Sequence, residues 1–361
     1  MSFEDTDFRQ EVLDLGNPYD VKLVAGFLQP LGFEFMPTDV DYTHILYSLS
    51  GDIIATGSYK GHILKYVAVA PKYRDSTAFA LVVTTLTEKV LANHRNTCVF
   101  TKPENAKYFM GLGFKKIAEA SPLFCMLEFG FDTIMDYQDY LKVLKKNAQT
   151  NKIASIVVNC NPFTSGHRHL IEKAASENEW VYLFVVQEDL SVFPFEIRWE
   201  LIKKGISHLT NVVMVKGGDY IVSGAIFPAY FLKNENVSEI MKKQAELDVG
   251  IFAQYVVPVF GITKRYVGSE NYCKTTAAYN VAMKAILPKY GVEVIEITRI
   301  TSASEGADNP PCISASMVRA AIKNDKLTTM LSCLPDVTRE FLLSDASEEI
   351  RNKIKATEGR H

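Results

Sequence analysis

The sequence predicts an α/β protein with two domains, and three observations support that prediction. The chain has 361 residues, more than twice the roughly 150 residues of one typical domain. From residue 148 onward, short apolar runs alternate with helix-forming stretches, which favours a parallel, Rossmann-like sheet with crossover helices. Before that point the apolar runs follow one another closely, as in an antiparallel meander. We therefore expect an α+β domain over 1–147 and a parallel-sheet domain over 148–361 that ends in a helical tail.

Composition excludes several classes of protein. Hydrophobic residues make up 47% and charged residues 22% of the chain, and the formal net charge is −3, so collagen, a long coiled coil and a disordered chain are ruled out. Neither half is strongly basic, so we expect no nucleic-acid partner. The apolar runs are far shorter than the roughly 20 residues of a membrane helix. The six cysteines include no CxxC pair, and the acidic N-terminal stretch resembles no signal peptide. We expect a cytoplasmic protein with no membrane association.

The pattern of apolar runs places the elements of both domains. In the first domain we expect strands at Thr43–Leu49, Ile53–Tyr59, Ile63–Val69, Thr97–Phe100 and Phe124–Phe129. Helices are expected there at Ala78–Asn93 and Asn105–Leu112. In the second domain we expect strands at Ile153–Val158, Val181–Val186, Val212–Val215, Val256–Phe260 and Val292–Ile297. The helices between and after them are expected at Gly166–Asn178, Phe195–Leu209, Asn236–Tyr255, Thr275–Leu287 and Ser314–Lys323. Ligands of such sheets bind beyond the carboxyl ends of the strands, so polar motifs directly after strands are candidates for the site.

The first such motif is NPFTSGH, which follows the strand Ile153–Val158. Pro162 and Gly166 favour a turn, and Gly166 allows the backbone to approach a ligand closely. His167 lies in the first turn of the following helix, where free N–H groups and the helix dipole favour an anion. With the hydroxyl of Thr164 beside it, the motif suits phosphate oxygens and the charge of a departing phosphoryl group. Taken alone, the motif is equally typical of a threonine N-cap with a surface histidine.

The second motif is ISASMVR, near the end of the predicted sheet. Ser314 is a suitable N-cap, Ser316 lies in the first helical turn, and Arg319 is three residues further on, on the same helix face. Two hydroxyls and a guanidinium make a second phosphate cradle, although the motif alone also fits a capped helix with a solvated arginine. Two such motifs after the first and last strands of one sheet are difficult to explain as coincidence. The P-loop pattern GxxxxGK[ST] is absent from the sequence.

These motifs resemble the nucleotidyltransferase superfamily. NPFTSGH is similar to the TxGH form of its HxGH signature, and ISASMVR to its ISxSxxR-type signature. Four segments over residues 151–335 resemble the citrate lyase ligases in particular. They are NCNPFTSGHRHLIEKAA, KGGDYIVSGAIFPAYFLK, VGSENYCKTTAAYN and EITRITSASEGADNPPCISASMVR.

The resemblance implies an activity and a set of site residues. It implies a ligase that uses ATP with Mg²⁺ to activate acetate as acetyl-adenylate. The acetyl group then passes to the thiol of the coenzyme-A-like prosthetic group on the acyl carrier subunit of citrate lyase, with release of AMP and diphosphate. Catalytic roles are expected for Thr164, His167 and Arg319, and ATP-binding roles for Asn161, Pro162, Phe163, Gly166, Ser314 and Ser316. We expect no metal ligand among the protein side chains. An adenylyltransferase that acts on a phosphorylated small molecule such as phosphopantetheine is the main alternative, and a carrier-docking protein with an inactive transferase domain is another.

Several further residues are weaker candidates for the site. Asn159 ends the first strand, Lys216 and Asp219 follow the third, and Arg265 could bind a carboxylate or a phosphate. Each of the four also fits a plain structural role. We expect Arg198 to be a helix-face residue and Cys160 a buried bystander, since no acid or histidine is placed by the sequence to activate the thiol.

The first domain resembles the GNAT acyltransferase family. KYRDSTAFALVVTTLTEKV is similar to the loop and helix after its central strand, and PENAKYFMGLGFKKI to a later segment. The chain departs from the family in the loop at Arg74–Ala78, where glycines are missing and Asp75 adds a negative charge that disfavours a pyrophosphate. We therefore expect a non-catalytic binding or docking module. An active acyltransferase and a purely structural role are the alternatives.

Overall fold

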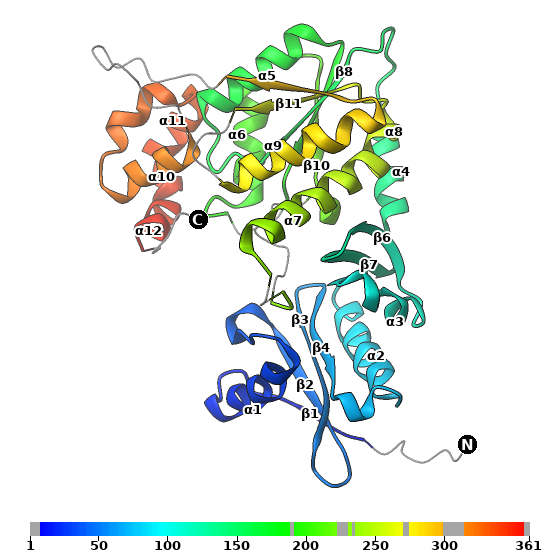
Figure 1. Cartoon of the computed structure of the whole chain (residues 1–361). Helices are drawn as coiled ribbons and strands as arrows, with labels where there is room; N and C mark the ends of the chain where they lie inside the picture. Colours follow the sequence, from blue (N-terminus) through cyan, green and yellow to red (C-terminus); the bar gives the residue numbers. More distant parts are fainter. Residues whose placement is uncertain are drawn as a thin grey trace. The chain divides into compact units, whose positions relative to one another are not determined.

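The computed structural model describes residues 8–187, 191–221, 230–232, 235–269, 274–298 and 314–356. The chain divides into two compact units (Figure 1). The first contains Met1–Tyr137 together with Phe227–Leu247, and the second contains Gln138–Ile226 and Asp248–His361. The sequence prediction did not include the return of the segment Phe227–Leu247 to the first unit.

The first unit is built on a seven-stranded mixed sheet. The strands lie in the order β1-β2-β3-β4-β5-β7-β6, and all neighbouring pairs are antiparallel except β4 and β5. Their bounds are β1 Arg9–Val12, β2 Tyr42–Tyr47, β3 Ile53–Lys60, β4 Ile63–Val69, β5 Asn96–Thr101, β6 Lys115–Ala120 and β7 Phe124–Gly130. The helices are α1 Pro18–Leu28, α2 Ala78–Leu91, α3 Ala106–Met110 and α4 Ile134–Leu144, the last of which continues into the second unit. The α+β prediction for this part of the chain is confirmed.

Side-chain alternation along β2 explains why helices cover both faces of this sheet. Leu46 packs into a core with α2, whereas Ile45 and Tyr47 pack on the opposite side with Val24 and Leu28 of α1. Successive strand residues point to opposite faces, so a strand with apolar residues in both registers needs a cover on each side. The fold of the first unit follows from that pattern.

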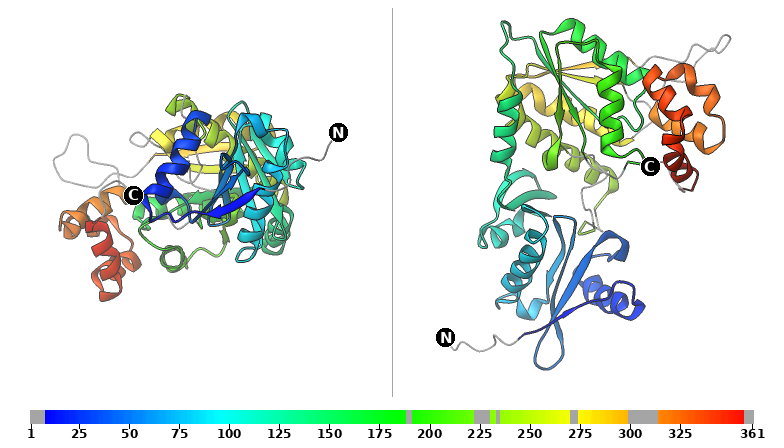
Figure 2. Two further views of the ribbon diagram at one scale, coloured as in Figure 1. Left: turned by 90° about the horizontal axis from the view of Figure 1, so that it is seen from below. Right: turned by 180° about the vertical axis from the view of Figure 1, so that it is seen from behind.

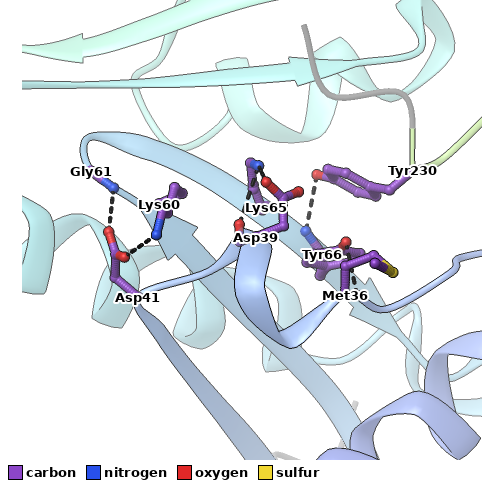
Figure 3. A network of polar contacts seen from close by, with 8 residues as sticks. All are labelled: Met36, Asp39, Asp41, Lys60, Gly61, Lys65, Tyr66 and Tyr230. Carbon is purple, nitrogen blue, oxygen red and sulfur yellow. Dashed lines mark hydrogen bonds and ion pairs between the residues drawn. The ribbon is translucent and has the colours of Figure 1, made fainter. Parts of the chain in front are cut away.

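The returning segment is fixed to the first unit through Tyr230. Strands β4 and β5 pair only at Ile63 and Leu64. Further along β4, the backbone N–H of Tyr66 donates a hydrogen bond to the Tyr230 hydroxyl at 2.9 Å, and the two rings lie 4.0 Å apart (Figure 3). Beside them, the Lys65 ammonium pairs with the Asp39 carboxylate at 2.6 Å. Tyr230 therefore supplies the acceptor that a neighbouring strand would otherwise give to Tyr66.

The second unit contains a five-stranded parallel sheet in the order β10-β9-β8-β11-β12. The bounds are β8 Ile153–Val158, β9 Trp180–Val185, β10 Val212–Lys216, β11 Lys264–Gly268 and β12 Glu293–Ile297. The α-helices are α5 Ser165–Glu177, α6 Phe195–Gly205, α7 Val237–Ile251, α8 Val257–Phe260, α9 Lys274–Ile286, α10 Ala315–Lys323, α11 Asp336–Leu343 and α12 Glu348–Ala356. Helix α7 begins in the first unit and ends in the second. The predicted fold class is confirmed, with the first motif directly after the central strand.

One predicted strand is wrong. Val256–Phe260 is helical, because a π-helical turn over Phe252–Val256 runs directly into α8. A short apolar run cannot be told from a buried helix by its periodicity alone. The strand that pairs with β8 on the side away from β9 is β11, Lys264–Gly268, which was missed because it opens with two charged residues.

The C-terminal helices gather beside the sheet of the second unit, and Figure 2 shows α10 to α12, in orange and red, as one cluster. Val318 and Ile322 of α10 are buried in an apolar core with Ile350 and Ile354 of α12. Phe193, from the loop after β9, is buried in the same core. This packing connects α10 to the carboxyl edge of the sheet. Among the described residues, no helix is both long and apolar enough to cross a membrane.

Candidate active site

The opening of α5 holds His167 in one orientation. Thr164 is the N-cap, and its side chain and the His167 side chain form a reciprocal capping box. The backbone N–H of Thr164 donates to Nδ1 of His167 at 3.1 Å, and the Thr164 hydroxyl lies 2.9 Å from the same nitrogen. Because Nδ1 accepts the backbone hydrogen bond, the neutral imidazole carries its proton on Nε2. The sequence prediction of a threonine cap beside His167 is confirmed.

The loop before α5 is supported from below by the core. Phe163 is fully buried, and its ring lies nearly parallel to the His167 ring, at 6.3 Å between centroids. Gly205 at the end of α6 makes room for it, since a Cβ there would lie 2.4 Å from the Phe163 ring. Pro162 is buried and Gly166 is half-buried in the first turn of α5. Phe163 therefore supports the loop from inside the core.

The opening of α10 reaches the same loop. Ser314 caps the helix by accepting a hydrogen bond from the N–H of Met317, and the hydroxyls of Ser314 and Ser316 lie 3.0 Å apart. From the next turn, the guanidinium of Arg319 donates to the carbonyl oxygen of Asn161 at 2.5 Å. Burial lowers the pKa of Arg319 below its ordinary value. The two motifs thus meet at Asn161, through a contact between residues 158 positions apart in the chain.

A fully buried arginine of α6 organises this edge of the sheet. Arg198 of α6 donates to the carbonyl oxygens of Phe193 at 2.9 Å, Asn159 at 2.9 Å and Val186 at 2.8 Å. The Asn161 side chain also accepts from the N–H of Phe193. Arg198 therefore joins the ends of two strands and the loop after β9. In the sequence, the position of Arg198 shortly after the apolar residues Val192 and Phe193 is the feature that points to its burial.

Two of the weaker candidates lie at the same edge of the sheet. Lys216, Val185 and Val158 are in register across β10, β9 and β8, so Lys216 and Asn159 both lie at the carboxyl edge. Asn159 exchanges hydrogen bonds with Ser191 at 2.9 and 3.2 Å. The Lys216 ammonium lies 5.7 Å from the centroid of the Phe195 ring. The edge therefore presents one ammonium near the strand that leads into the first motif.

The remaining candidates are placed differently. Asp219 is exposed in a short 3₁₀ turn after β10. Arg265 lies in β11 opposite Ser155 of β8, within the sheet, and is almost completely buried. Cys160 is buried with a positive φ of 53°, and burial raises the pKa of its thiol well above the ordinary value, as expected for a bystander. Within the described ranges, no three His, Cys, Asp or Glu side chains gather closely enough to hold a metal ion.

Comparison with known proteins assigns the family. The family model described as citrate lyase ligase C-terminal domain matches residues 153–342, a range that contains both motifs. The chain is also 36% identical over 299 residues to the [citrate [pro-3S]-lyase] ligase of Escherichia coli K12, covering 80% of this chain and 81% of that protein. The chain belongs to the citrate lyase ligase family. The family resemblance seen in the sequence is confirmed.

Solved structures resemble each part of this family member. A bifunctional NMN adenylyltransferase/ADP ribose pyrophosphatase from Francisella tularensis covers 57% of this chain and 52% of its own, at 15% identity and a TM-score of 0.33. An acetyltransferase of the GNAT family from Staphylococcus aureus Mu50 covers 34% of this chain and 99% of its own, at 11% identity and a TM-score of 0.28. Since both TM-scores are low, the fold class rests on the sheet topology described above.

Proposed function

We propose that this chain is an ATP-dependent ligase that activates acetate as acetyl-adenylate and acetylates the prosthetic-group thiol of the citrate lyase acyl carrier subunit. The observation that carries the proposal is the hydrogen bond from Arg319 to the carbonyl of Asn161. It joins two helix N-termini at the carboxyl edge of one parallel sheet, one with a hydroxyl and an imidazole N–H and the other with two hydroxyls and a guanidinium. Free N–H groups and cations at such an edge suit a polyphosphate.

The chain's own groups have separate roles in the proposed first step. Acetate is already ionised at neutral pH, so the step needs positioning and charge stabilisation more than proton transfer. An acetate oxygen bonds to the α-phosphorus as the bond from that phosphorus to the bridging oxygen breaks, and diphosphate leaves. Nε2–H of His167 and the Thr164 hydroxyl are assigned to the transferring and leaving phosphates. Ser314, Ser316 and Arg319 are assigned to the β- and γ-phosphates.

In the second proposed step, the carrier thiolate bonds to the acyl carbon and AMP departs. Mg²⁺ bound to the triphosphate would neutralise part of its charge. The hydroxyl and guanidinium groups of the two openings suit phosphate oxygens directly, which leaves the metal to be bound through the nucleotide. For the first unit we propose a non-catalytic docking role, supported by the exposed Asp75 in the loop before α2.

The test is exchange of labelled diphosphate into ATP that depends on acetate. His167→Ala should lower the exchange rate by on the order of 10²-fold or more, as for other preorganised groups that stabilise developing charge. His169→Ala, two residues further along the same helix, is the matched control and should exchange at the wild-type rate.

Three results would contradict the proposal. Wild-type exchange that ignores acetate but responds to a phosphopantetheine-like acceptor would favour the adenylyltransferase alternative. Absence of ATP binding in calorimetry would favour the inactive docking protein. Normal exchange by the His167 variant would remove that residue from the chemistry.

A further inference from the structure

The second unit contains a small cavity on one side of its sheet. Its volume is about 20 Å³. The walls come from β8, β11, the turn after β10 and the helical layer of α7, the π-turn and α9. The lining side chains include Val157, Ile221, Asp248, Phe252, Arg265 and Met283.

Arg265 is the distinctive member of this lining. Only 8% of the residue is exposed. Its Nε and Nη1 atoms are buried and have no hydrogen-bond partner among the residues that the structure describes. Its guanidinium carbon lies 4.6 Å from the centroid of the Phe252 ring. A buried donor without an acceptor is costly, and a guanidinium offers five of them in a planar fork.

The charge of Arg265 persists in this position. Burial lowers its pKa to about 10, and the Asp248 carboxylate acts in the opposite direction. The group therefore remains protonated at neutral pH. The Asp248 carboxylate lies in the same lining, yet Nε and Nη1 of Arg265 have no acceptor among the described residues.

The apolar side chains of the lining suit a short alkyl group, and the cavity lies near the carboxyl edge of the sheet. Val157, Ile221, Phe252 and Met283 provide apolar walls next to the cation. Val157 lies two residues before Asn159 in the same chain segment, about 7 Å of extended strand. The cavity thus approaches the carboxyl edge where the two helix openings meet.

We infer that this cavity is the binding site for the carboxylic acid substrate, with the Arg265 guanidinium donating hydrogen bonds to the carboxylate and the apolar walls contacting the alkyl end. The inference rests on the proposed function for the identity of the acid as acetate. A carboxylate matches the two parallel N–H donors of a guanidinium. The small volume restricts the acid to the shortest members of the series, so it also accounts for discrimination against longer chains.

The main test replaces Arg265 with methionine, which keeps the length of the side chain and removes its charge. Arg265→Met should raise the KM for acetate by at least roughly 30-fold, the effect of removing one partner of a buried charge pair, and leave the KM for ATP unchanged. Acetate should raise the melting temperature of the wild type and not that of the variant. Lys264→Met removes the same charge from the adjacent residue, which points to the other face of the sheet, and should behave as the wild type in both assays.

A second variant keeps the inference testable if Arg265→Met does not fold. Met283→Ala enlarges the cavity and should shift the ratio of kcat/KM for propionate over acetate upward by about 10-fold, the usual effect of one methylene in a fitted pocket. An unchanged ratio would overturn the inference.

The remaining outcomes separate this inference from the proposed function. A folded Arg265→Met protein with wild-type KM and thermal response to acetate would overturn the inference, while acetate-dependent exchange in the wild type would still support the ligase. A wild type that neither exchanges with acetate nor binds it in calorimetry would overturn both. Acetate binding without exchange would support the cavity and contradict the ligase.

Discussion

Two buried arginines in the second unit differ in how their donors are used. Arg198 is fully buried, and its guanidinium donates to three carbonyl oxygens at 2.8–2.9 Å. Arg265 is nearly as buried, yet Nε and Nη1 find no acceptor among the described residues. Both side chains hold a cation away from bulk water, at a cost that only good hydrogen bonding offsets.

The unequal hydrogen bonding distinguishes a structural cation from one that is available for a ligand. Arg198 compensates its own burial by fixing the backbone of Asn159, Val186 and Phe193, the segments that carry the candidate site. Nε and Nη1 of Arg265 make no such bonds among the described residues, so their burial reduces stability unless a ligand supplies the acceptors. Stability is often given up in this way at functional sites.

The largest expected effect comes from exchanging each arginine for methionine. Arg198→Met leaves three buried carbonyl groups without their donor and should destabilise the protein by roughly 3 kcal/mol or more. Arg265→Met removes a buried charge with two donors that lack acceptors among the described residues, so its free energy of unfolding without acetate should equal or exceed that of the wild type. Urea unfolding of the two variants provides the measurement. Equal destabilisation by both variants would contradict the different roles of the two arginines.

A buried histidine in the first unit sharpens the comparison, because histidine can lose its charge and arginine cannot. His44 of β2 is fully buried, and neither ring nitrogen has a hydrogen-bond partner within the described ranges. Burial lowers the pKa of His44 to about 4 from its ordinary 6.5. Between these values the unfolded state binds more protons than the native state, so stability is complete above pH 6.5 and falls as the pH decreases toward 4.

The loss of stability caused by His44 reaches at most about 3 kcal/mol at the acid end of that interval. His44→Leu should flatten the dependence of the unfolding free energy on pH between 4 and 6.5, as followed by urea denaturation at several pH values. Retention of the wild-type slope would mean that another group causes it.

The smallest expected effect concerns the support beneath the loop of the first motif. A Cβ at Gly205 would lie 2.4 Å from the Phe163 ring, whereas nothing lies within 4 Å of a Cβ at Gly250. Gly205→Ala should destabilise the protein by about 1–3 kcal/mol through overpacking. Gly250→Ala, near the end of α7 where the helix continues into the π-helical turn, should stabilise it by up to about 1 kcal/mol. Thermal unfolding tests both, and a neutral Gly205→Ala would show that Phe163 can move without cost.

The sequence by itself determined the fold class, the parallel strands β8, β9, β10 and β12, and the two helix openings. These depend on local patterns, namely apolar runs that suit buried strands and polar residues that cap helices. It also predicted Thr164 next to His167, since the N-cap residue and the residue at N3 lie next to each other at the start of a helix.

Only the tertiary structure decided which distant groups meet. The contact of Arg319 with Asn161 and the three bonds of Arg198 join segments whose separation in the chain contains no information about their distance in space. Strand β11 was missed, and Val256–Phe260 was assigned to the wrong element, because charge and apolarity there reflect the tertiary surroundings and not local propensity. Arg265 became informative only when its burial and its unused donors were known, for a sequence shows a charge but not whether water or protein surrounds it.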